Sequence, residues 1–106
     1  MNTQYKKGVL EVCVLAQIYK RDMYGYEIVQ NISETMEVNE GTIYPILRRL
    51  TKEGNFETYM QQSTEGPARK YYRITDEGKN HLKSMVKDWY HFAELVNELL
   101  KEVDFT

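Results

Sequence analysis

Basic side chains gather in the middle of an otherwise acidic chain. Residues 41–75 contain six Lys and Arg against three acidic residues, although the 106-residue chain has a formal net charge of −2. Guanidinium and ammonium groups bind phosphate oxygens, while amide and hydroxyl groups can bond the edges of bases. The pattern therefore predicts a localised face for an anionic polymer. The candidates for phosphate contacts are Arg48, Arg49, Arg69 and Lys70, and the candidates for base contacts are Asn39, Thr42 and Tyr44.

A basic cluster also has a simpler explanation, because many exposed charges are only solvated and contribute little. The two explanations differ in the elements that must carry the cations. A nucleic-acid interface requires a helix or a hairpin that projects them, whereas a solvated surface requires neither. The elements around residues 41–75 therefore decide how the cluster is interpreted.

Apolar spacing predicts two helices before the basic segment. Residues 9–19 are apolar on almost every side of a helical wheel, which indicates a central helix buried on most faces. After a polar break at residues 20–22, an amphipathic helix is predicted over about residues 25–36. A short polar connector, residues 37–41, has the length that joins the two helices of a helix-turn-helix.

The segment that carries Arg48 and Arg49 is predicted to be the third helix. Its apolar positions are 43, 46, 47 and 50, and Gly54 ends it. We predict Thr42 as the N-cap, which places Pro45 in the first turn, where its missing amide loses no hydrogen bond.

A hairpin and a long helix complete the chain. Residues 56–62 and 70–75 are rich in Tyr, Thr and Phe, and the turn-forming residues 63–68 lie between them. Thr75 and two following acids predict a helix start, and the last helix is expected over about residues 76–103.

The last helix carries two interleaved heptad series. Such a pattern is typical of a coiled-coil seam, and a helix this long overhangs the small domain to which it belongs. We therefore predict a C2 homodimer in which the helix pairs with a second copy. The predicted seam residues are Leu82, Met85, Trp89, Phe92, Val96, Leu99 and Val103.

Together these elements predict a mainly α fold with a small β-hairpin. Residues 1–75 are expected to form a winged helix-turn-helix domain, and residues 76–106 a C-terminal dimerisation helix. In this arrangement the third helix enters the major groove and the wing contacts the flanking backbone.

Four stretches, in order and suitably spaced, carry a resemblance to a known family. They are GVLE at residues 8–11, YGYEI at 24–28, GTIYP at 41–45 and GPARKYYRIT at 66–75. Over about its first 80 residues the chain resembles the PadR family of transcriptional regulators, in the short subgroup with a single C-terminal helix. Asn55-Phe56 departs from that pattern, because the family has two apolar residues entering the wing.

The resemblance implies a dimeric DNA-binding repressor. Helix 3 and the wing would lie on a palindromic double-stranded operator, and the first and last helices would form the dimer interface. Family members respond to small aromatic compounds or lipophilic drugs, so relief of repression by such a ligand is expected.

Trp89 is the residue that could carry such sensing, with Phe92 and Met85 beside it. A tryptophan is large for a seam position, so it either splays the helices or stacks across the dyad, and either arrangement can open an aromatic gap. The alternative is that all three residues only pack the interface, as Met and Phe at helical spacing commonly do.

Other chemistry has little support in the sequence. Cys13, the single cysteine, lies in an apolar run and is read as a buried, inert thiol in a reducing compartment. His81 and His91 have no third ligand at metal spacing. We therefore expect that the protein is not an enzyme and that it binds no cofactor or metal. We also expect no membrane span, and the N-terminus is read as that of a cytoplasmic protein.

The function predicted from the sequence is sequence-specific transcriptional regulation. Two other classes stay open: a winged-helix module that binds proteins, and a ligand-binding protein without DNA binding. The first would need no Asn, Thr and Arg on the outer face of the third helix, and the second would need no basic wing.

Overall fold

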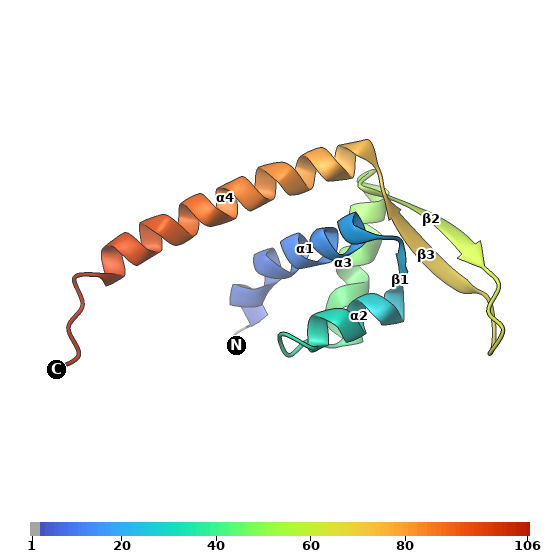
Figure 1. Cartoon of the computed structure of the whole chain (residues 1–106), viewed down its shortest axis with the longest axis horizontal. Coiled ribbons are helices and arrows are strands. Elements are labelled where there is room, and N and C mark those ends of the chain that lie inside the picture. Colours follow the sequence, from blue (N-terminus) through green and yellow to red (C-terminus); the bar gives the residue numbers. More distant parts are fainter. Residues whose placement is uncertain (1–2) are drawn as a thin grey trace.

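The computed structural model describes the backbone of residues 3–106 and the side chains from residue 8 onward. Four helices pack together and a small antiparallel sheet projects from one end of them (Figure 1), which confirms the predicted fold class: mainly α, with a wing. The elements are α1 (Thr3–Lys20), β1 (Met23–Tyr24), α2 (Gly25–Ser33), α3 (Glu40–Lys52), β2 (Phe56–Gln61), β3 (Arg69–Ile74) and α4 (Asp76–Leu100).

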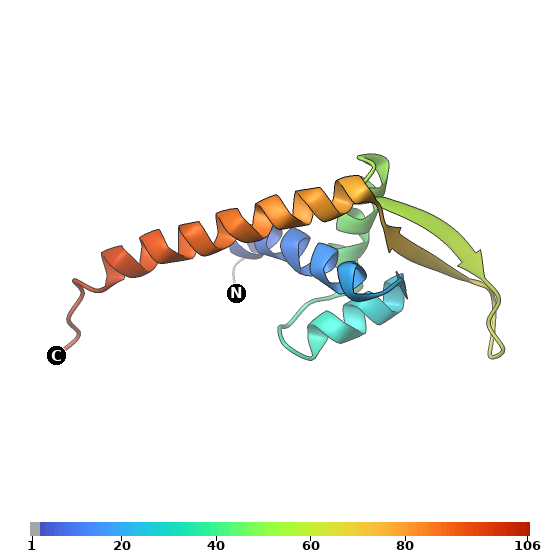
Figure 2. The ribbon, with the colours of Figure 1, turned by 45° about the horizontal axis from the view of Figure 1, so that its top comes forward.

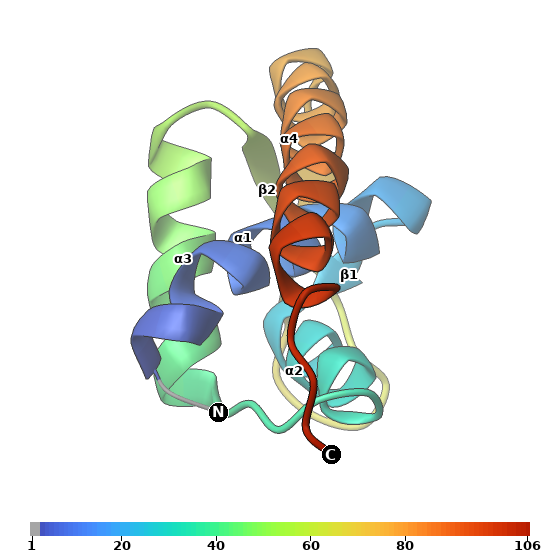
Figure 3. The ribbon, with the colours of Figure 1, turned by 90° about the vertical axis from the view of Figure 1, so that its left-hand side faces the viewer.

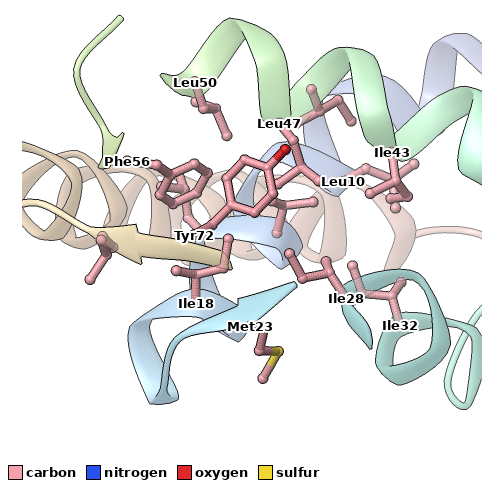
Figure 4. Packing of buried hydrophobic residues seen from close by; sticks show 14 of the residues in the cluster. Leu10, Ile18, Met23, Ile28, Ile32, Ile43, Leu47, Leu50, Phe56 and Tyr72 are labelled. Atoms are coloured by element: carbon pink, nitrogen blue, oxygen red, sulfur yellow. The ribbon is translucent and has the colours of Figure 1, made fainter. Parts of the chain in front are cut away.

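The core forms around α1, as its apolar wheel predicts. Leu10, Val14, Leu15 and Ile18 of this helix are at most 1% exposed. Figure 4 shows side chains from α1, α2, α3 and the sheet meeting in one cluster, with the Tyr72 ring between the helices and the strands. Burial of this apolar surface is the main favourable term that holds the helix-turn-helix together.

The start of α3 differs from the prediction. Asn39 is the N-cap, and its side-chain oxygen accepts a hydrogen bond from the Thr42 amide at 3.1 Å. The predicted Thr42 cap was wrong because asparagine caps a helix as well as threonine does and lies earlier in the chain. Pro45 therefore lies beyond the first turn, where its ring leaves the Gly41 carbonyl without the usual partner. Both residues are exposed, so water can satisfy that carbonyl.

The sheet contains a strand that the sequence did not indicate. The strand order is β1-β3-β2, and both pairings are antiparallel. Tyr72 lies between Met23 of β1 and Thr58 of β2. Since α2 begins directly after β1, the pairing of β1 with β3 connects the wing to the helix-turn-helix without an intervening loop.

The long helix α4 starts at the wing and runs beside α1. Thr75 is its N-cap and accepts a hydrogen bond from the Gly78 amide at 3.0 Å. The helix ends at Leu100, three residues before the predicted end, so Val103 lies outside it. Its 25 residues correspond to a length of about 37 Å.

The last turns of α4 extend beyond the helix-turn-helix (Figure 1). Figures 1 and 2 show α4 passing over α1 and projecting past it toward the C-terminus. The view along the long axis shows α3 and α4 on different sides of α1 (Figure 3). Leu82, only 7% exposed, joins the main core, so the first turns of α4 pack with residues 1–75. The division into two domains stays a prediction.

Candidate nucleic-acid interface

Arg48 is an exposed cation of α3 and, like Lys52 at the end of the helix, has no carboxylate partner among the described residues. Its helix is packed through Ile43, Ile46, Leu47 and Leu50, so the side chain projects from the opposite, solvent-facing side. An unpaired guanidinium on an exposed helix face is available for a phosphate oxygen.

Arg49, the next residue, is held differently. Its Nη1 lies 3.2 Å from Glu11 Oε1 of α1 and 3.2 Å from Glu53 Oε1. The hydrogen bond that Arg49 donates to Glu11 raises the pKa of the Arg49 guanidinium above its ordinary value. The negative charges of Glu11 and Glu53 raise this pKa as well. With two carboxylates around it, Arg49 fits a link between α1 and α3 better than a phosphate contact, and its predicted DNA contact stays a prediction.

The three residues predicted for base contacts lie at the start of α3. Asn39 Oδ1 is occupied by the Thr42 amide, and the Thr42 hydroxyl donates to the same oxygen at 3.3 Å. The Tyr44 ring packs against α2, because a Cβ added to Gly25 would lie 2.5 Å from its Cε1. Burial, with a contribution from Glu40, raises the pKa of the Tyr44 hydroxyl. All three side chains therefore have structural roles here, and their base contacts stay untested.

Arg69 and Lys70 point to opposite faces of the wing. Tyr72 and Ile74 of β3 are buried on the core side, and side chains alternate along a strand. Lys70 therefore lies on the same face as Tyr72 and beside Met60 of β2, whereas Arg69 lies on the outer face beside Gln61. The guanidinium of Arg69 sits over the Tyr24 ring, 4.5 Å from its centre.

Aromatic rings cover the outer face of the sheet, which the sequence did not indicate. Tyr71 contacts Tyr24 at a centroid distance of 5.5 Å and stacks on Tyr59 at 5.6 Å. Asp22 accepts hydrogen bonds from the Tyr59 hydroxyl at 2.7 Å and from Arg73 Nε at 3.3 Å. Arg73 is thus paired with a carboxylate, and Arg69 remains the outer-face cation without one in the described chain.

The predicted seam forms an apolar stripe that is buried at the start of α4 and mostly exposed toward its C-terminal end. Leu82 is buried and Met85 half-buried, but Trp89 is 40% and Leu99 75% exposed. Phe92 and Val103 are also exposed, and Val96 is half-buried. A single chain therefore leaves much of this apolar stripe in contact with water, which is unusual for an isolated small protein.

A shallow groove of about 370 Å³ lies where this stripe meets α1. Gly8, Val9 and Val12 line it from α1, and Met85, Asp88, Trp89 and Phe92 line it from α4. The three residues predicted for ligand binding, Met85, Trp89 and Phe92, thus line one groove, and the carboxylate-bearing Asp88 lines it as well.

Comparison with known proteins assigns this geometry to a family. The model of the PadR-like family of transcriptional regulators matches residues 14–84. The chain belongs to the PadR-like family. A crystal structure of a PadR-like regulator from Bacillus cereus is similar to it with a TM-score of 0.85, at 40% identity over 95% of this chain and 100% of that one.

Two curated relatives match along most of this PadR-like chain. It is 35% identical to an uncharacterised protein of Lysinibacillus sphaericus, over 92% of this chain and 94% of that protein. It is 30% identical to the negative transcriptional regulator PadR of Bacillus subtilis, over 89% of this chain but 52% of that regulator. The chain is therefore a DNA-binding transcriptional regulator with a winged helix-turn-helix fold, not an enzyme.

Cys13 and His81 both lie against other parts of the PadR-like chain. Burial raises the pKa of the half-buried Cys13 thiol, which disfavours the reactive thiolate. His81 Nε2 lies 3.5 Å from Glu11 Oε1. The described residues contain no group of three or more potential metal ligands. Among residues 3–106, no helix combines the length and apolar character needed to cross a membrane.

Proposed function

We propose that this PadR-like chain is a homodimeric cytoplasmic repressor that binds a palindromic operator. Residues 1–75 would serve as the DNA-binding domain, and residues 76–106 as the dimerisation segment. The observation that carries the DNA part is that α3 and the wing both carry cations free to bind phosphate: Arg48 on α3 and Arg69 and Lys70 on the wing have no carboxylate partner in the described chain. These are the two elements that a winged helix places on DNA.

Within this proposal the residues have different tasks. Arg48 and Lys70 supply phosphate contacts from α3 and from the inner face of the wing. Arg69 supplies one from the outer face. Asn39 and Thr42 fix the N-terminal end of α3, from which they and Tyr44 would approach base edges. Arg49 is the weakest of the predicted contacts, because two carboxylates already surround it.

The dimer part of the proposal is supported by the exposed stripe on α4. Trp89, Phe92 and Leu99 are all at least 40% exposed, and the last turns of their helix project past α1 (Figure 1). A second copy of α4 would bury the stripe by the same apolar pairing in both directions, as an isologous C2 interface requires.

The ligand part of the proposal is supported by the groove at Trp89. An aromatic or lipophilic compound that stacks on the indole would fill a space lined by Met85, Phe92 and residues of α1. The carboxylate of Asp88, which also lines the groove, favours a cationic or neutral compound over a phenolic anion.

Footprinting tests the proposal directly. Purified protein is incubated with the DNA upstream of its own gene and with genomic fragments. We expect a protected palindrome with half-sites about 34 Å apart, one turn of the double helix. A single asymmetric site bound by a monomer would refute the dimeric reading. Absence of protection together with weak, salt-insensitive binding would refute DNA binding and favour a protein-interaction module.

A further inference from the structure

Arg69 is a wing cation that an aromatic ring, and not a carboxylate, holds in place. Its guanidinium lies 4.5 Å from the centre of the Tyr24 ring. Its side chain is half-buried, although the neighbouring loop residues 64–68 and Lys70 are exposed. In the described chain no carboxylate pairs with it. The charge is thus held in place without being neutralised.

The Tyr24 ring that holds Arg69 is itself supported. Tyr24 pairs with Tyr71 between β1 and β3, and their rings are 5.5 Å apart. Tyr71 stacks on Tyr59 with an interplanar angle of 18°. Tyr59 is anchored in turn, because its hydroxyl donates to Asp22 at 2.7 Å. The ring under Arg69 therefore belongs to a connected row of side chains rather than to a loose surface contact.

Tyr24 also occupies a junction of the backbone. It is the last residue of β1 and the residue directly before α2, so its ring connects the helix-turn-helix to Tyr71 and Arg69 of β3. A cation over an aromatic face is attracted without losing its charge, and the planar guanidinium stacks on the ring better than an ammonium group does.

We propose that Tyr24 is a positioning residue for DNA binding: its ring holds the Arg69 guanidinium, at the loop end of β3, in the orientation that meets a DNA phosphate. The inference rests on the proposed DNA-binding function and adds to it a residue that need not touch DNA. The competing explanation is that the row of rings only stabilises the sheet.

The first experiment needs no DNA. The ring current of Tyr24 should shift the Arg69 side-chain protons upfield in the NMR spectrum of the free protein. We expect this shift to persist in Tyr24→Phe, which keeps the ring, and to disappear in Tyr24→Leu. Tyr19→Leu, the same change at an exposed tyrosine of α1, is the matched control and should leave the shift intact. Absence of the shift from the wild-type spectrum would overturn the proposal.

The second experiment measures affinity for a random-sequence duplex by fluorescence anisotropy. Tyr24→Leu should weaken binding by about two- to five-fold, the range of an exposed cation–π contact, whereas Tyr24→Phe and Tyr19→Leu should bind like wild type. In an Arg69→Ala background, Tyr24→Leu should cause no further loss. An equal loss in Tyr24→Phe, or an undiminished loss in that background, overturns the positioning role.

Two controls separate this inference from loss of the fold and from failure of the proposed function. If Tyr24→Leu lowers the melting temperature more than Tyr19→Leu does, Arg69→Lys gives the same test without altering the ring, and it should weaken binding while the fold is unchanged. Wild-type protein that binds no duplex refutes DNA binding, and the positioning role with it, even where the ring-current shift is present. Wild-type binding that is insensitive to Tyr24 refutes only the positioning role.

Discussion

Arg48 and Arg49 are neighbours in α3, yet only Arg49 is paired with carboxylates. Arg49 Nη1 lies 3.2 Å from both Glu11 and Glu53, whereas Arg48 has no such partner in the described chain. Neighbouring helical positions are rotated by about 100°, which turns Arg49 toward α1 and Arg48 toward solvent. Variants at Arg48 and Arg49 can therefore be compared to test whether DNA binding depends on the side of α3 from which an arginine projects.

Alanine at these two positions should have different effects. Arg48→Ala should weaken binding to any duplex and reduce the slope of log affinity against log salt by about 0.9, the value of one lost phosphate contact. Arg49→Ala should leave that slope unchanged and lower stability by at most about 1 kcal/mol, because the pair is partly exposed. Anisotropy titrations at several salt concentrations and thermal melts measure both. Equal slope changes would contradict the assignment.

Gly78 should not tolerate a side chain. It is buried at the start of α4, and an added Cβ would collide with the Asn55 backbone oxygen. Gly78→Ala should therefore destabilise the protein by about 1–3 kcal/mol. Gly8→Ala, in α1 with nothing within 4 Å of the added atom, should instead stabilise it by about 0.5–1 kcal/mol. Chemical denaturation compares the two, and a neutral Gly78→Ala would disprove the contact.

The tyrosine hydroxyls predict a loss of stability in alkali. The hydrogen bond to Asp22 raises the pKa of Tyr59, and burial raises the pKa of Tyr72, both from an ordinary value of 10.0. An acid whose pKa is raised by folding gives stability that is complete below its unfolded pKa and is lost as pH rises through the folded one. Stability should therefore fall above pH 10.

Tyr59→Phe isolates one part of this effect. The variant should be less stable than wild type at neutral pH, because it lacks the bond to Asp22, and the difference should shrink above pH 10, where the wild-type hydroxyl ionises. Denaturation at a series of pH values measures it. A difference that stays constant across the series would exclude the Tyr59 hydroxyl as the titrating group.

Leu99 should decide the assembly state. It is 75% exposed in the single chain, so Leu99→Asp would place a charge in the proposed interface without disturbing the core. We expect a monomer by sedimentation, with weakened DNA binding. Asn97→Asp adds the same charge to an exposed position off the stripe and should remain a dimer. A dimeric Leu99→Asp would remove α4 from the interface.

Trp89→Ala separates packing from ligand binding. If the indole lines a ligand site, planar aromatic cations should quench the fluorescence of this single tryptophan and release wild-type protein from DNA. The alanine variant would remain dimeric and bind DNA but would no longer respond. If Trp89 only packs, no member of such a panel quenches it, and the variant loses only dimer stability.

The sequence predicts well what is set by local apolar patterns. The wheel of α1, the spacing within α3 and the turn residues of the hairpin place these elements, and both long strands lie within one residue of their predicted bounds. Strand β1 was missed because two residues carry no period. It exists only through its pairing with Tyr71 and Tyr72.

The site was harder to predict because partners far apart in sequence decide which cations are available. Arg49 is 38 residues from Glu11, and Arg73 is 51 residues from Asp22, so no local pattern signals either pairing. The opposed faces of Arg69 and Lys70 could have been found. Once Tyr72 and Ile74 are assigned to the core, alternation places Lys70 with them and Arg69 on the other side.

The single residue Thr75 joins β3 to α4, so no loop separates the wing from the long helix. From Asp76 to Trp89, α4 measures about 20 Å. A tilt of ten degrees about Trp89 would swing its wing end by roughly 3.5 Å, close to the rise between neighbouring nucleotides of one DNA strand. A ligand bound at the indole that tilted α4 about this point would therefore displace the start of α4, next to the wing, by about one base step.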